Sequence, residues 1–153
     1  MTFNDFIYSN IPISSPATEE DIHFLYKLLS SREFNISHRK SPSLEDHRAF
    51  VLNHPYRNWS LVLRNNTSIG SVYSGFDNSV GITLFPDFLL YRRSVIRKFL
   101  ETFAPLPGRA SIVRDEFIFN VAIEDLKYQE DLLNCGAIQI QHTYSIKKIN
   151  PTL

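Results

Sequence analysis

The sequence has little cysteine, little glycine and no long apolar run: among 153 residues there are one cysteine and five glycines. Cys135 alone cannot form an internal disulfide, which agrees with a reducing compartment. No apolar stretch approaches the roughly 18 residues that cross a bilayer. The first ten residues lack the positive charge and the apolar core of a signal peptide. We therefore expect a cytoplasmic protein with no membrane partner.

Net charge is also absent, because 16 lysines and arginines balance 16 aspartates and glutamates. The balance gives no indication of a nucleic-acid partner, so any basic site must be local. The length predicts one domain, residues 1–153, that is large enough to bury a core of its own. Twelve phenylalanines and seven tyrosines favour a packed mixed fold over a loop-rich one.

The first part of the chain has the periodicity of a short strand and two helices. Ile11 and Ile13 around a proline predict an edge strand. Thr18 and Asp21 form a capping-box pattern that opens a helix ending near residues 30–31. A second helix begins after Ser43, is expected to direct Phe50 and Val51 inward, and ends before residues 54–55.

From residue 59 the apolar pattern alternates, which predicts strands. Three strands of a meander are separated by turns at 65–66 and 77–78. Residues 117–121 predict another strand, and 126–133 a helix that ends at Gly136 in the left-handed C′ position. Residues 138–149 read as a final pair of strands or one long bent strand. The fold class is therefore α/β, with a mixed, mostly antiparallel sheet and helices on both faces.

The stretch at 79–101 holds the strongest functional pattern. A strand ends at Pro86-Asp87, and a helix follows that carries Arg92 and Arg93 near its start. Unpaired N–H groups at a helix N-terminus favour anions, so strand, loop and basic helix together predict an anion site. The other reading is a solvated helix face beside an apolar stripe.

Three stretches resemble the GNAT acyltransferase superfamily over nearly the whole chain. They are residues 16–21 (PATEED) before the first helix, 54–59 (HPYRNW) with 69–73 (IGSVY), and 117–121 (FIFNV) continuing to 132–136 (LLNCG). The resemblance implies a GNAT-like fold and an N-acetyltransferase that passes an acyl group from acetyl-CoA, or another acyl-CoA, to a small amine. No pair of histidines has the spacing of metal ligands, so we expect no metal.

One part of the family pattern is missing. The family's pyrophosphate loop, R/Q-x-x-G-x-G/A, lets backbone amides approach the phosphates, and residues 89–94 (LLYRRS) contain no glycine. Arginine forks suit a diphosphate, so we expect Arg92, Arg93 and Ser94 to hold the donor. The backbone at Leu84 and Phe85 is expected to hold the thioester oxygen.

The resemblance also directs attention to polar residues on the acceptor side. We expect His38 to be the base, with Tyr73 and Asn120 beside it in the catalytic group. Asn120 is read as a buried amide facing the cleft. His54, Tyr56 and Arg57 are expected to bind the substrate.

Two functions therefore stay open, and a variant of the first keeps the chemistry but takes the acyl group from a carrier-protein thioester. The first is an acyl-CoA-dependent N-acyltransferase that attacks the thioester directly with an amine. The second is a non-catalytic GNAT-fold module that has lost the acyl-CoA site and binds a ligand or a protein. A homodimer is an allowed assembly in both cases.

Overall fold

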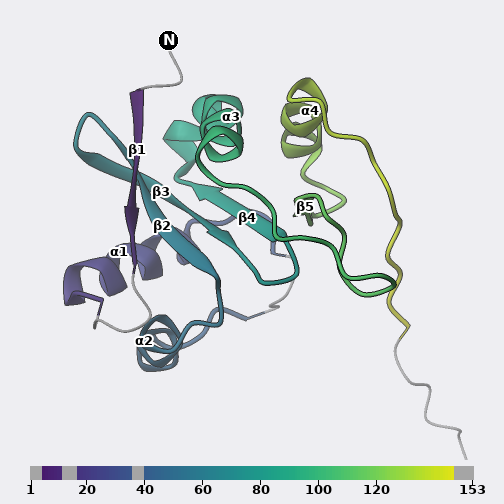
Figure 1. Cartoon of the computed structure of the whole chain (residues 1–153). Coiled ribbons are helices and arrows are strands. Elements are labelled where there is room, and N and C mark those ends of the chain that lie inside the picture. The colour runs from purple at the N-terminus through teal and green to yellow at the C-terminus, as the bar shows by residue number, and fades with distance from the viewer. Residues whose placement is uncertain (1–4, 12–16, 36–39, 147–153) are drawn as a thin grey trace, which may run out of the picture.

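A five-stranded mixed sheet organises the chain in the order β1-β2-β3-β4-β5 (Figure 1). The computed structural model describes residues 5–11, 17–35 and 40–146. Neighbouring strands are antiparallel from β1 to β4, whereas β5 runs parallel to β4. The strands are β1 (Phe6–Asn10), β2 (Asn58–Arg64), β3 (Thr67–Ser74), β4 (Ser79–Leu84) and β5 (Ile118–Phe119). The predicted mixed, mostly antiparallel sheet is confirmed.

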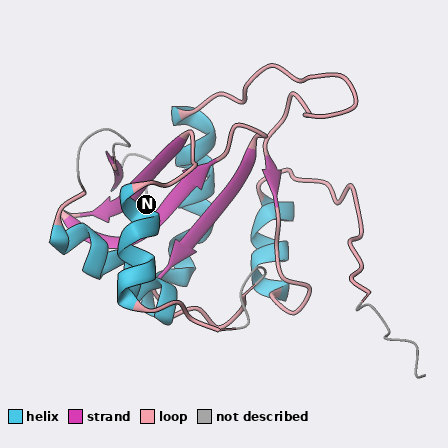
Figure 2. Cartoon of the chain, turned by 90° about the horizontal axis from the view of Figure 1, so that it is seen from below, coloured by secondary structure: helices cyan, strands magenta, loops and turns pink. Residues whose placement is uncertain are grey.

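Helices cover both faces of this sheet, as predicted (Figures 1 and 2). On one face, α1 (Glu19–Ser30) and α2 (Leu44–Leu52) pack on residues such as Trp59. On the other, the 3-10 helix η2 (Pro86–Tyr91), α3 (Arg92–Thr102) and α4 (Leu126–Asn134) pack on residues such as Ile82. Among the described residues, no helix has the length and apolarity to cross a bilayer.

Local sequence signals set several boundaries as predicted. The Thr18 side chain accepts from the Asp21 N–H, and the Asp21 carboxylate accepts from the Thr18 N–H, which completes the capping box. Asn65 and Asn66 take positive φ at the β2–β3 turn, and Gly136 takes positive φ after α4. These residues stop or turn the chain with groups that lie within a few positions of each other.

The first strand was predicted in the wrong place. The first strand is β1 at Phe6–Asn10; Ile11, which was expected in the strand, follows it as a buried residue, and residues 12–13 lie outside the described ranges. Phe6 is fully buried, and the Tyr8 hydroxyl donates to the Val95 carbonyl at 2.7 Å. These long-range contacts, invisible in the local pattern, attach the segment to the sheet edge.

Three other expectations were wrong in part. Phe50 is exposed, although Val51 beside it is buried. The strand predicted at 117–121 contains only Ile118 and Phe119. Residues 138–146 form no strand, and 147–149 lie outside the described ranges.

Asn78 anchors the long connection between α3 and β5. Its backbone takes φ 64° at the β3–β4 turn, and its side chain is fully buried. The amide donates to the carbonyls of Leu106 at 2.9 Å and Arg114 at 2.7 Å, and its oxygen accepts from the Leu106 N–H at 2.7 Å. A residue predicted only as a turn former thus holds the 103–117 connection against the sheet.

Candidate functional site

Strands β4 and β5 part soon after they meet. Their pairing consists of Ser79 with Ile118 and Val80 with Phe119, while β4 continues to Leu84. The Phe85 N–H donates to the Ile69 carbonyl on β3 at 3.0 Å. Since successive N–H groups of a strand alternate in direction, those of Ile82 and Leu84 face the opposite edge, beyond the end of β5. The amide predicted at Leu84 therefore points into the divergence, whereas that of Phe85 is used within the sheet.

Tyr128 of α4 lies in this divergence. Its side chain is buried, and the Ile82 N–H interacts with its phenol oxygen. Burial raises the pKa of Tyr128, and the nearby Arg92 charge and the Ile82 amide oppose that rise. An N–H that lacks a strand partner on this edge is thus directed at an oxygen atom of a side chain.

Arg92 and Arg93 connect α3 to α4. Arg92 is only 5% exposed; its Nε donates to Asp131 Oδ2 at 3.0 Å, and its Nη1 lies 3.5 Å from Asp125 Oδ2. Arg93 donates from Nε to Asp131 Oδ1 at 2.8 Å and from Nη2 to Glu130 Oε1 at 2.9 Å. The Arg92 guanidinium also lies 4.4 Å from the Tyr128 ring centroid. Carboxylates of the same chain therefore neutralise both arginines.

Backbone N–H groups just before α3 also have hydrogen-bond partners within the chain. Residues 86–91 form η2, in which the Phe88 N–H donates to the Phe85 carbonyl at 2.9 Å, and the Arg92 N–H donates to Leu89. A 3-10 turn consumes N–H groups that a glycine-rich loop would leave free. Ser94, the remaining predicted donor contact, is half-buried in the first turn of α3.

An aromatic cluster lies on the other face, formed by Phe50, His54, Tyr56, Trp59 and Tyr73. Tyr56 and Tyr73 stack with ring centroids 4.0 Å apart and an interplanar angle of 12°. His54 is 5.8 Å from Tyr56 and 5.1 Å from Trp59, measured between ring centroids. The cluster thus brings together three predicted site residues, His54, Tyr56 and Tyr73.

Gly81 allows Tyr73 to lie over β4. The two residues face each other across β3 and β4, and a Cβ on Gly81 would be 2.1 Å from the Tyr73 ring. Only glycine admits the ring at this position. The aromatic cluster therefore reaches the stretch of β4 where β5 has already ended.

Burial keeps the two stacked phenols protonated. Burial raises the pKa of Tyr56 to about 12; the neighbouring Tyr73 adds to the rise and the Arg32 charge opposes it. The pKa of Tyr73 is also raised, chiefly by burial, again against Arg32. Arg32, just after α1, thus sets a positive charge beside the pair. Arg32 could not be predicted as part of this site, because no local pattern links residue 32 to residues 56 and 73.

The remaining predicted residues do not join this cluster as expected. Arg57 donates to the Ala104 carbonyl at 3.0 Å, toward the end of α3. Asn120 is exposed just after β5; it was wrong to expect a buried strand amide, because the strand ends at Phe119. His38 lies outside the described residues.

His54 serves the structure at one of its ring nitrogens. Its Nε2 lies 3.3 Å from the Ile11 carbonyl oxygen, while the buried Nδ1 has no hydrogen-bond partner among the described residues. Burial lowers the pKa of His54, and the Ile11 carbonyl partly offsets this. The imidazole is therefore held neutral beside Tyr56.

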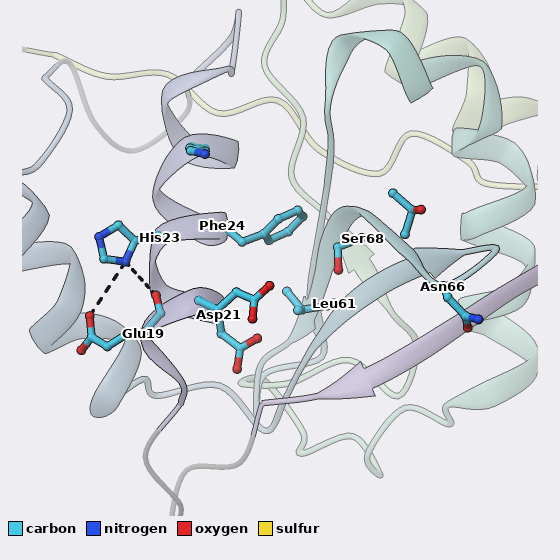
Figure 3. Close-up of a pocket in the computed structure, with 10 residues that line it drawn as sticks. Glu19, Asp21, His23, Phe24, Leu61, Asn66 and Ser68 are labelled. Atoms are coloured by element: carbon cyan, nitrogen blue, oxygen red, sulfur yellow. Dashed lines mark hydrogen bonds and ion pairs between the residues drawn. The ribbon is translucent and has the colours of Figure 1, made fainter.

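A separate open groove of about 610 Å³ lies between α1 and the β2–β3 turn (Figure 3). Glu19, Glu20 and Asp21 of the first turn of α1 line one side, with Asn66 and Ser68 on the other. His23 contacts Glu19 on this helix. The groove contains none of the predicted site residues. In the described ranges, no group of three or more His, Cys, Asp or Glu side chains has the arrangement of a metal site.

Comparison with known proteins identifies the type of fold, through a solved structure. No family model matches the chain, and no curated protein matches it. A crystal structure described as "a possible acetyltransferase from Clostridium difficile 630" superposes with a TM-score of 0.54 at 7% identity, over 95% of this chain and 98% of that chain. The fold is GNAT-like. At this identity the likeness extends to the architecture alone.

Proposed function

We propose that this GNAT-fold chain is an acyltransferase that passes an acyl group from acetyl-CoA, or another acyl-CoA, to a small amine. The observation that carries the proposal is the edge of β4 after Val80, where no strand of the described ranges lies beside the N–H groups of Ile82 and Leu84. Such groups can donate to the oxygen of a thioester as its carbonyl gains negative charge. The interaction of the Ile82 N–H with the Tyr128 phenol supports this, because a phenol oxygen is an acceptor of similar character.

The reaction in this proposal is a direct transfer. The amine nitrogen bonds to the carbonyl carbon, and the negative charge passes to the carbonyl oxygen beside the Leu84 N–H. The C–S bond then breaks to release the CoA thiolate, and the nitrogen loses its excess proton, which replaces the proton that Tyr73 gives to the thiolate. A proton leaves the ammonium before attack, and we assign this step to His38, the base that the sequence predicts.

Tyr73 is the proton donor in this proposal, whereas His38 is the proton acceptor. The raised pKa keeps the Tyr73 phenol protonated at neutral pH, so this group is unsuited to accept a proton from the amine, and we assign to it the protonation of the thiolate. Tyr56 and His54 would form the wall of the acceptor site, and the Arg32 charge would favour an acceptor that also carries an anionic group. Asn120 is exposed just after β5, and in this proposal it would contact the donor from outside.

The two arginines that the sequence predicts for the donor's diphosphate are already paired with carboxylates. To contact Arg92 or Arg93 the diphosphate must compete with the carboxylates of Asp125, Glu130 and Asp131. We therefore expect weak donor binding. Glu130→Gln removes one carboxylate from the partly exposed Arg93, so it should tighten binding if this guanidinium meets the diphosphate.

The second candidate is a non-catalytic module that binds a ligand through the aromatic cluster. The filling of the divergence by Tyr128 and Arg92 favours it, since a pantetheine arm along β4 needs that space. In this case the stacked tyrosines would bind a ligand without any donor present.

Thermal unfolding with acetyl-CoA, CoA and longer acyl-CoAs distinguishes the two candidates. A ligand at about 100 times its Kd stabilises a protein by about 2.7 kcal/mol, which is a shift of roughly 5–11 °C for a chain of this size. The enzyme hypothesis expects such a shift and thiol release when amines are added, with thiol release reduced in Tyr73→Phe.

Tyr128→Ala provides the matched control, because it removes the phenol ring from the divergence and changes no residue of the aromatic cluster. No shift with any acyl-CoA, in either the wild type or Tyr128→Ala, would contradict the enzyme hypothesis and leave the binding module.

A further inference from the structure

Two phenol hydroxyls of the aromatic cluster have no hydrogen-bond partner among the described residues. The hydroxyls of Tyr8 and Tyr26 donate to backbone carbonyls at 2.7 and 3.1 Å, whereas those of Tyr56 and Tyr73 donate to no described group. Both side chains are partly exposed, so their polar ends are within reach of a ligand. Burial raises the pKa of both phenols, so each keeps its proton at neutral pH. The cluster therefore presents two O–H donors that no described residue uses.

Arg32 adds a positive charge to these two donors. It lies just after α1, is exposed, and interacts electrostatically with both phenols. All 16 aspartates and glutamates of the chain lie in the described ranges, and none of them forms an ion pair with Arg32. Arg92 and Arg93, by contrast, are neutralised by carboxylates of α4. The guanidinium of Arg32 therefore remains available to an anion from outside.

Two neutral donors and one cation match a ligand group with a single negative charge. A guanidinium fork pairs with the two oxygens of a carboxylate, and phenol O–H groups donate to the lone pairs that remain. A phosphate, with nearly two charges at neutral pH, would keep part of its charge uncompensated here. One carboxylate of the chain acts on this pair of phenols, that of Asp77 on Tyr73, and it accepts from the Ser79 N–H at 2.9 Å. An external carboxylate is therefore the anion that fits.

The Tyr73 hydroxyl lies over β4, short of the place that receives the thioester in the proposed function. A Cβ on Gly81 would be 2.7 Å from this hydroxyl oxygen. Leu84, whose N–H faces the divergence, is three residues further along β4, which is about 10 Å of strand. A carboxylate at the hydroxyl and an amine at the thioester are thus several bonds apart. An α-amine, one carbon from its carboxylate, does not span this distance.

We propose that Arg32, Tyr56 and Tyr73 bind the carboxylate of the acceptor, an amino acid whose reacting amine lies several carbons from that carboxylate. The inference rests on the proposed function for the fate of the amine. Carboxylate binding itself needs no donor, so it can be measured apart from acyl transfer. The chain thus selects its acceptor at the end of the molecule opposite the reacting nitrogen.

Titration without a donor tests the carboxylate site. The probe is 6-aminohexanoate, and 6-aminohexanamide is the matched ligand without the charge. Trp59, the single tryptophan, lies 5.2 Å from Tyr56 between ring centroids, so its indole N–H signal in the ¹⁵N-labelled protein reports binding at the cluster. The carboxylate should move this signal to saturation, and the amide should bind about tenfold or more weakly. No movement at millimolar 6-aminohexanoate, equal binding of the two ligands, or tighter binding of inorganic phosphate would overturn the proposal.

Three variants locate the contact. Arg32→Gln removes the charge at an exposed position and should weaken 6-aminohexanoate binding about tenfold or more. Tyr56→Phe keeps the ring and removes the hydroxyl, and should weaken binding about threefold to tenfold. Lys27→Gln removes a positive charge from the exposed last turn of α1 and should leave the affinity unchanged. Wild-type affinity in Arg32→Gln, or an equal loss in Lys27→Gln, would refute the site.

Acyl transfer tests the position of the amine. With acetyl-CoA, 6-aminohexanoate should react with a higher kcat/KM than glycine, and Arg32→Gln should raise its KM with little change in kcat, because the carboxylate is bound equally before and during the reaction. A higher kcat/KM for glycine would contradict the spacing. If no amine is acylated although 6-aminohexanoate binds and Arg32→Gln abolishes that binding, the carboxylate site is supported and the acyltransferase proposal is wrong.

Discussion

Asp131→Asn is the substitution that tests the junction of α3 and α4 most severely. Asp131 is 2% exposed, and its two oxygens accept from Arg92 at 3.0 Å and Arg93 at 2.8 Å. The asparagine side chain has nearly the same shape, so packing is preserved while the charge is lost. Of the carboxylates in the described ranges, Arg92 then keeps Asp125, at 3.5 Å, as its one partner.

The expected cost follows from the burial of Arg92. Removing one partner of a buried ion pair costs about 3–5 kcal/mol, because the remaining charge stays out of water. Since Asp125 and one amide oxygen remain, we expect the lower end, about 3 kcal/mol. For a chain of this size that is a fall in Tm of roughly 6–12 °C.

Urea unfolding followed by circular dichroism measures this cost, with the m-value checked to be unchanged. Glu130→Gln is the control, because Glu130 pairs with Arg93 and Lys127 at the surface, where such pairs contribute about 1 kcal/mol or less. Arg92→Met combined with Asp131→Leu should regain much of the loss, as no buried charge is left. A loss below about 1 kcal/mol for Asp131→Asn would refute the view that this junction is a tightly coupled buried pair.

Three further predictions concern other parts of the fold. Asn78→Ala removes three hydrogen bonds to the 103–117 connection; it should cost about 2–4 kcal/mol in urea unfolding and speed proteolysis there, whereas unchanged cleavage would argue against an anchor. Gly81→Ala places a Cβ 2.1 Å from the Tyr73 ring; it should disturb the near-ultraviolet circular dichroism of the stack and cost about 1–3 kcal/mol, and an unchanged spectrum would contradict this. Burial lowers the pKa of His47 and of His54, so the unfolded chain binds protons first as the pH falls; stability should decline below about pH 6.5, less steeply in His47→Gln, and a flat profile would contradict this.

Local signals explain what the sequence predicted of the fold. The Thr18–Asp21 box, the Asn65-Asn66 turn and Gly136 act through groups close in sequence, so residue type and spacing determine the outcome. The position of the first strand was predicted wrongly because contacts with α3 and its surroundings hold Phe6 and Tyr8 in place. One of them is the hydrogen bond from the Tyr8 hydroxyl to the Val95 carbonyl. Such contacts leave no trace in a local pattern.

The candidate site shows the same limit. Arg92 and Arg93 were predicted correctly at the start of a helix after β4. Their shared partner, Asp131, lies on α4, 39 residues from Arg92 and 38 from Arg93. The sequence shows the charges and not the pairing. Conversely, His54, Tyr56 and Tyr73 do come together, because strand alternation places Tyr73 on the face that α1 and α2 cover.

The most direct test of the central claim is the amide spectrum of the ¹⁵N-labelled protein during titration with acetyl-CoA. If the edge of β4 receives the thioester, the Ile82 and Leu84 signals should move and saturate together, while that of Phe85, bonded to Ile69, should change little. If neither signal moves at millimolar acetyl-CoA, this edge does not receive the donor and the acyltransferase proposal is wrong.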